Sequence, residues 1–133
     1  MLKVSQITKE SRGHDLLVKV LFHVVKLTAE QEFIQPPTKI LQNMSCADIL
    51  VGDETGCIFF FAVHEQVEIM KPGCTILLRN FDIEVSESCL RLKVNMWGSV
   101  DCVEPGLTTV INTRRNYSIL DFDSFVSQHK PTV

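Results

Sequence analysis

Few residues in this chain have the types and the spacing that catalysis requires. The segment GDETG, from Gly52 to Gly56, lacks the lysine of a phosphate-binding loop, and a strand-like run follows it instead of a helix. The histidines have no partner at the spacing of a Ser-His-Asp triad or an HExxH site. They are His14, His23, His64 and His129. We therefore expect a protein that is not an enzyme and that uses no cofactor.

The cysteines form no recognisable site either. They make no CxxC pair, no histidine lies at ligand spacing, and their odd number argues against a disulfide framework. The N-terminal segment MLKVSQITKESRGH has no signal-peptide core, and no apolar run approaches the roughly 20 residues of a membrane span. We expect reduced thiols, no metal, no membrane contact and an intracellular location, in the nucleus or the cytoplasm. The five cysteines are Cys46, Cys57, Cys74, Cys89 and Cys102.

Composition predicts one folded domain whose overall charge is unfavourable for nucleic acid. The chain has 133 residues, of which 45% are hydrophobic and 22% charged, which suits one globular core. Its net charge is −3 and its pI is about 5.8, so it lacks the positive field of many nucleic-acid binders. This is a mild argument, because a local groove can be basic on an acidic protein.

Runs of apolar and β-branched residues predict five strands. Between the first two, Pro36 and Pro37 resist both helix and strand, so residues 29–45 are predicted to form a long loop. The last run alternates, with Leu90 and Leu92 on one side and Arg91 and Lys93 on the other. The strands are expected at Leu16–Leu27, Cys46–Val51, Cys57–Val63, Cys74–Val85 and Ser88–Val103.

The connections between these strands predict the fold. GDETG is typical of a hairpin, with Asp53 capping the turn and Gly56 in a left-handed bulge position. After the third strand, Val67 and Met70 lie three residues apart, which predicts a short helix. Three strands, a short helix and two strands are typical of an all-β OB-fold, a five-stranded Greek-key barrel with one helix between strands three and four.

Several segments, in their order along the chain, closely resemble a largely uncharacterised family of small OB-fold proteins. The family is best known from plants and is described as nucleic-acid-binding or single-stranded-DNA-binding-like. The matching segments include GHDLLVKVL, LVGDETGCIFFFA, QVEIMKPGCTILLRNFDI, RLKVNMWGSV and NYSILDFDSF. More distantly, the chain is similar to the small OB subunit of the single-stranded-DNA sensor complex and to replication protein A OB domains. The resemblance implies one OB-fold domain over residues 1–126 and a flexible tail over 127–133.

The resemblance also implies which side chains face outward. Ile58, Phe60 and Ala62 match inward positions of the family, which leaves Phe59 and Phe61 on the outer side of the third strand. OB-folds hold single strands there, by aromatic stacking combined with cations along the backbone.

We therefore expect Phe59 and Phe61 to stack on bases, and Arg91, Lys93 and Lys19 to contact phosphates. By strand alternation, Trp97 is predicted on the same outer face as Arg91 and Lys93, either as a further stacking residue or as a packing anchor.

Two observations keep alternatives open. The two outward phenylalanines are also compatible with a cover formed by the Pro36–Pro37 loop or the C-terminal segment, or with a protein interface. In addition, Asp82, Glu84 and Glu87 lie where carboxylates would repel phosphate. The first hypothesis is binding of single-stranded DNA or RNA with little sequence selectivity. The alternative is a protein-interaction OB module, or a homodimer, that uses the apolar outer face of the third strand.

Overall fold

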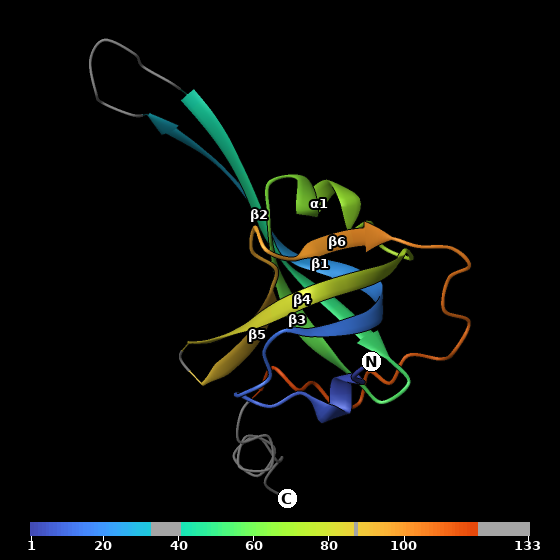
Figure 1. Ribbon diagram of the computed structural model, residues 1–133. Coiled ribbons are helices and arrows are strands. Elements are labelled where there is room, and N and C mark those ends of the chain that lie inside the picture. The colour runs from blue at the N-terminus through green and yellow to red at the C-terminus, as the bar shows by residue number, and fades with distance from the viewer. Residues whose placement is uncertain (33–40, 87, 120–133) are drawn as a thin grey trace, which may run out of the picture.

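Strands dominate the part of the chain that the structure describes. The computed structural model describes residues 1–32, 41–86 and 88–119, with the side chains outside 25–45 (Figure 1). Its elements are the 3₁₀ turn η1 (Val4–Gln6), the helix α1 (Glu65–Ile69) and the strands β1 (His14–Glu32), β2 (Leu41–Asp53), β3 (Gly56–Val63), β4 (Thr75–Ser86), β5 (Cys89–Lys93) and β6 (Ser99–Cys102).

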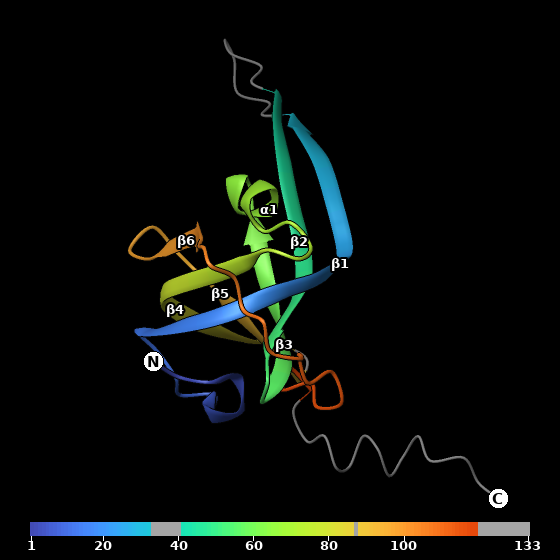
Figure 2. The same cartoon turned by 90° about the vertical axis from the view of Figure 1, so that its right-hand side faces the viewer.

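Five strands close into a ring. The sheet order is β1-β2-β3-β5-β4, β4 also pairs with β1, and β6 adds to the other edge of β4. All pairings are antiparallel except that of β3 with β5, which is parallel. The helix α1 lies between β3 and β4 in the chain and covers one end of the ring through Val67, with Met70 just after it (Figure 2). The predicted OB-fold with its single short helix is confirmed.

Alternation along β3 divides its side chains between the core and the outer surface. Ile58, Phe60 and Ala62 are fully buried, whereas Phe59 and Phe61 are partly exposed. Because neighbouring residues of a strand point to opposite faces, this pattern confirms the inward and outward assignment.

The first hairpin is longer than predicted. β1 and β2 stay paired from Lys19 and Gly52 to Glu32 and Leu41, and they project from the barrel as a two-stranded arm (Figures 1 and 2). The prediction of a loop over residues 29–45 is therefore wrong at both ends of that range. Hydrogen bonds between the two backbones extend the hairpin there, although the sequence has no apolar pattern typical of strands. Pro36 and Pro37 lie outside the described residues.

The predicted fifth strand ends early. β5 stops at Lys93, and a turn precedes β6. The side chain of Asn95 accepts a hydrogen bond from the Trp97 N–H at 2.9 Å, and its carbonyl accepts one from the Gly98 N–H at 3.0 Å. A Cβ on Gly98 would lie 2.4 Å from the Arg79 carbonyl oxygen, so only glycine allows this close approach. The prediction, from alternation, that Trp97 lies on a strand is thus wrong.

In the β2–β3 turn Asp53 forms the predicted cap, whereas Gly56 is required for another reason than the predicted one. One carboxylate oxygen of the buried Asp53 accepts the Thr55 N–H at 2.8 Å, and the other accepts the Val4 N–H of η1 at 2.9 Å. Gly56 does not have a positive φ, so the left-handed assignment is wrong. Glycine is required there because a Cβ would lie 2.4 Å from the Tyr117 ring.

Ser118 completes the barrel at one of the places where β3 and β5 separate. These strands pair directly only at two positions, Phe59 with Arg91 and Phe60 with Leu92. At one end Ser118 accepts the Phe59 N–H on its hydroxyl at 2.7 Å and the Leu90 N–H on its carbonyl at 2.7 Å. The C-terminal segment, as far as it is described, therefore closes the barrel against β3 and β5.

No helix in the described part of the chain is long and apolar enough to cross a bilayer.

Candidate nucleic-acid interface

Outward residues of β2 and β5 flank the outward phenylalanines of β3. Phe59 pairs with Leu50 on β2 and with Arg91 on β5, and Phe61 pairs with Asp48 on β2. Paired residues of neighbouring strands project to the same side of a sheet. These residues and Lys93, the next outward residue of β5, form a surface that we call the β3 face. Its members are Asp48, Leu50, Phe59, Phe61, Arg91 and Lys93, of which Leu50 is buried and the other five are partly exposed.

Both phenylalanines of the β3 face remain partly exposed beside the C-terminal segment. Residues 112–119 run along the end of β3, where they exchange two backbone hydrogen bonds with Cys57, and Ser118 accepts the Phe59 N–H. This segment therefore covers the backbone of β3 up to Phe59, whereas the alternative predicted a cover over the phenylalanines themselves. The described residues do not fully cover the ring of Phe59 or that of Phe61.

An ion pair crosses β3 between the two rings. The Arg91 Nε lies 3.1 Å from Asp48 Oδ1, and its Nη2 lies 3.4 Å from Oδ2. Arg91 sits beside Phe59 on the β5 side, whereas Asp48 sits beside Phe61 on the β2 side, so the pair must span the strand. The hydrogen bond with Asp48 raises the pKa of Arg91. One of the two predicted phosphate ligands on this face is therefore already neutralised.

Lys93, the other basic residue of the β3 face, is not neutralised in the way that Arg91 is. Lys93 pairs in register with Asp82, but Asp82 makes its ion pair with Arg12, at 2.6 Å. No carboxylate of the described residues forms an ion pair with Lys93, which leaves its ammonium free for a phosphate. Glu84 is exposed opposite Arg91. Of the three carboxylates predicted to repel phosphate, Asp82 is thus neutralised by an ion pair, whereas Glu84 forms none with the described residues. Glu87 lies outside the described residues.

Lys19 lies away from the β3 face. It pairs with Gly52 on β2 and with Thr75 on β4, and Gly52 in turn pairs with Cys57. It is therefore two strands from β3, level with Cys57 and not with the two phenylalanines. The structure does not bring Lys19 together with the other predicted residues.

Trp97 also lies elsewhere, in the turn between β5 and β6. Its side chain is 79% exposed, which contradicts the packing-anchor interpretation. It borders a hollow of about 400 Å³ together with Arg12, Asn80 and Asp82, which belong to β4 and to the segment before β1. No residue of β2 or β3 lines this hollow.

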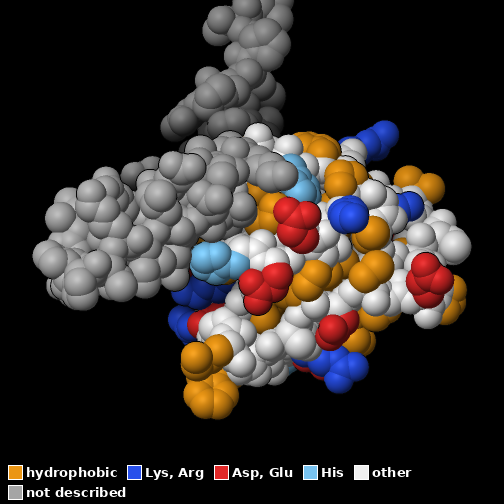
Figure 3. All heavy atoms as spheres, turned by 90° about the horizontal axis from the view of Figure 1, so that it is seen from above, with side chains coloured by type: hydrophobic (Ala, Val, Ile, Leu, Met, Phe, Trp, Pro, Cys, Tyr) orange, Lys and Arg blue, Asp and Glu red, His pale blue; other side chains and the backbone are white. Residues whose placement is uncertain are grey.

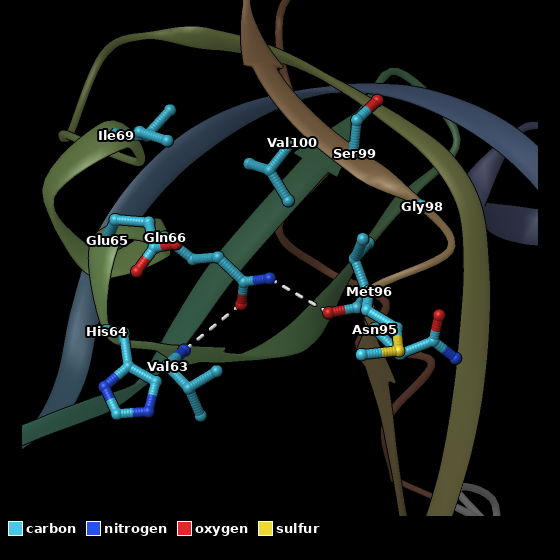
Figure 4. Close-up of a pocket in the computed structure, with 11 residues that line it drawn as sticks. Val63, His64, Glu65, Gln66, Ile69, Asn95, Met96, Gly98, Ser99 and Val100 are labelled. Atoms are coloured by element: carbon cyan, nitrogen blue, oxygen red, sulfur yellow. Dashed lines mark hydrogen bonds between the residues drawn. The ribbon is translucent and has the colours of Figure 1, made fainter.

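The described residues seen from the α1 end of the barrel form no broad basic surface. Acidic, basic and hydrophobic side chains are interspersed there (Figure 3). A cleft of about 410 Å³ separates α1 from the β5–β6 turn, with Met96 and His64 at its edge (Figure 4). Gln66 crosses it, accepting the Val63 N–H at 3.1 Å and donating to the Val94 carbonyl at 2.9 Å. Gln66 thus joins β3 and the end of β5 opposite Ser118.

The comparisons with known proteins agree with this geometry. A family model described as "Single-stranded DNA binding protein Ssb-like, OB fold" matches residues 7–102. The chain belongs to this family. It is therefore an OB-fold module of a single-stranded-DNA-binding-like family.

Relatives of this protein include two Arabidopsis thaliana matches. The uncharacterized protein At4g28440 is 35% identical over 124 residues, which cover 92% of this chain and 80% of the relative. The solution structure of hypothetical protein F20O9.120 has 34% identity and a TM-score of 0.73, covering 90% of this chain and 83% of that chain. The predicted resemblance to a plant OB-fold family is confirmed.

More distant structures share the fold alone. The OB domain of Ta0387 from Thermoplasma acidophilum has 13% identity and a TM-score of 0.57, covering 82% of this chain and 92% of that chain. The replication factor A related protein from Methanobacterium thermoautotrophicum has 13% identity and a TM-score of 0.51, covering 80% of this chain and 94% of that chain.

Proposed function

We propose that this protein binds single-stranded DNA or RNA on the β3 face, without catalysis. The observation that carries the proposal is the placement of Phe59 and Phe61, two partly exposed rings on the strand at the centre of the face. Stacking of a base on an aromatic ring is worth about 1–3 kcal/mol, and it tolerates any base because every base has a π-face. The family membership supports the same class of ligand.

Electrostatics make a smaller contribution in this proposal. Lys93 is available for a phosphate, whereas Arg91 must first leave Asp48. Each phosphate contact to a single strand contributes about 0.7 to the slope of log affinity against log salt. We therefore expect a slope of about 1, with stacking supplying most of the affinity and little discrimination between sequences.

The test is a titration of fluorescently labelled oligo-dT and oligo-U at two salt concentrations, by anisotropy. Phe61→Leu keeps the apolar volume but removes the aromatic face, and we expect it to weaken binding about fivefold or more. Val110→Ala is the matched control, because Val110 is 88% exposed and lies outside the β3 face. No binding at low salt, or equal affinities for both variants and the wild type, would contradict the proposal.

A second candidate function is a protein interface on the same side of the sheet. Phe22 on β1 is 51% exposed and pairs with Leu50, which pairs with Phe59, so an apolar row crosses three strands. The mass of the protein in solution, measured over a range of concentrations, separates the two candidates. A concentration-dependent dimer that binds no oligonucleotide would favour the interface.

A further inference from the structure

The turn between β5 and β6 holds an exposed indole on a fixed backbone. Trp97 is 79% exposed, although its main chain is tied down on both sides. Its N–H donates to Asn95 Oδ1 at 2.9 Å, and its carbonyl accepts from Asn80 Nδ2 at 3.1 Å. Tryptophan is highly buried on average, so an exposed ring on a hydrogen-bonded backbone is an arrangement suited to a ligand.

The space beside this ring has the properties of a small binding site. The hollow of about 400 Å³ next to Trp97 falls within the range of small-ligand sites. Arg12 lies on its border, and its side chain is 65% exposed even while it contacts Asp82. A guanidinium has five N–H donors, so Arg12 can keep this contact and still donate to a phosphate or a base edge.

A path of outward side chains connects this hollow to the β3 face. β5 lies between β3 and β4 in the sheet, and Lys93 on β5 pairs with Asp82 on β4. Paired strands are about 4.8 Å apart, so at Phe59 and Arg91, where β3 and β5 are paired, the step from β3 across β5 to β4 measures about 10 Å. Lys93 and Arg12 lie along this step; the charge of Arg12 is paired with Asp82, so Lys93 supplies the positive charge and Arg12 its remaining N–H donors.

We propose that Trp97 is a second base-stacking subsite, occupied by a nucleobase of the strand that the β3 face binds. The strand crosses from Phe61 over Lys93 to the hollow beside Arg12, where one base stacks on the indole. This inference rests on the proposed function, and it extends the bound strand to β4 and the β5–β6 turn, which lie outside the β3 face.

Trp97 is the only tryptophan of the chain, so its fluorescence reports this subsite directly. The full-length protein is titrated with labelled oligo-dT of about 4 and about 12 nucleotides, which bracket much of the range bound by single OB-folds. We expect the longer oligonucleotide to quench the tryptophan and the shorter one to quench it little. Trp97→Ala should weaken binding of the longer one about five- to tenfold and leave the shorter one unchanged, whereas Trp97→Phe should keep most of the affinity.

Met96→Ala is the matched control, because Met96 is 85% exposed in the same turn but borders the cleft under α1. Normal binding of the longer oligonucleotide by Trp97→Ala, without quenching in the wild type, would overturn the subsite and leave the β3 face intact. Absence of binding by any oligonucleotide would overturn both. Self-association that Trp97→Ala abolishes, with no change in oligonucleotide affinity, would assign Trp97 to a protein contact and also overturn the subsite.

Discussion

Replacing Asp48 by asparagine should strengthen nucleic-acid binding. Asp48 holds Arg91 through contacts of 3.1 and 3.4 Å, and the two side chains are 23% and 28% exposed. An ion pair with this much solvent access is worth about 1 kcal/mol, which a phosphate must replace before it can use Arg91. Asp48→Asn removes this cost, so we expect about fivefold tighter binding of oligo-dT.

The salt dependence should change with the affinity. Arg91 gains a phosphate contact in Asp48→Asn, so the slope of log affinity against log salt should steepen by about 0.7. Anisotropy titrations at four or more salt concentrations measure both quantities. Urea denaturation of the variant should show a loss of at most about 1 kcal/mol in the free energy of unfolding.

Two further variants isolate the cause. Glu84→Gln removes the same formal charge on the other side of Arg91 without breaking an ion pair, since Glu84 contributes least among the causes that raise the pKa of Arg91. We expect it to change affinity less than twofold and to leave the salt slope nearly unchanged. Adding Arg91→Ala to Asp48→Asn should cancel the gain. Equal gains from Asp48→Asn and Glu84→Gln, or no gain from Asp48→Asn in a stably folded protein, would refute the reasoning.

Three other predictions concern stability and reactivity. Ser118→Ala leaves the part-buried Phe59 N–H without its acceptor, so the free energy of unfolding in urea should fall by about 1–3 kcal/mol, and a loss below about 0.5 would contradict the closing role of this residue. Asp53→Ala removes the acceptor of two backbone N–H groups and should cost about 3 kcal/mol, with no specific effect on oligonucleotide affinity at temperatures where the variant is folded. The neighbouring Cys74 thiol raises the pKa of Cys102, which lowers the thiolate fraction of Cys102 at pH values near 8. Cys74→Ala should therefore speed alkylation of Cys102 by iodoacetamide, followed by peptide mass spectrometry, and an unchanged rate would contradict the assigned cause.

Much of the fold follows from local pattern. The apolar runs, the Asp53 cap and the spacing of Val67 and Met70 each depend on residues close in sequence, and all three appear in the structure. The two elements predicted wrongly have the opposite origin. The arm of β1 and β2 is extended by backbone pairing, and the turn after β5 is held by Asn80 on β4, whose side chain donates to the Trp97 carbonyl.

The β3 face was only partly predictable. The resemblance to a known family oriented Phe59 and Phe61 correctly, because alternation within one strand is a local property. The role of Asp48 was missed, since its contact with Arg91 requires the register of β2 with β3 and of β3 with β5 together. The available signal was weak: an acidic residue within the predicted apolar strand CADILV.

The positions of Ser118 and Trp97 could not be predicted from local sequence patterns either. Ser118 lies 59 residues from Phe59 in the sequence, and no local pattern indicates that it joins two strands. Trp97 was placed by alternation past Lys93, where the chain has already turned. Contacts made by turns and by the C-terminal segment depend on the closed barrel, so they emerge only with the structure.

The central claim is that single-stranded nucleic acid occupies the β3 face. A titration of ¹⁵N-labelled protein with oligo-dT, followed in ¹H–¹⁵N correlation spectra, tests it residue by residue. The account predicts that the largest shifts at low salt fall on the backbone amides of Asp48, Leu50, Phe59, Phe61 and Arg91. Shifts confined to other surfaces, or none at low salt and high oligonucleotide concentration, would contradict it.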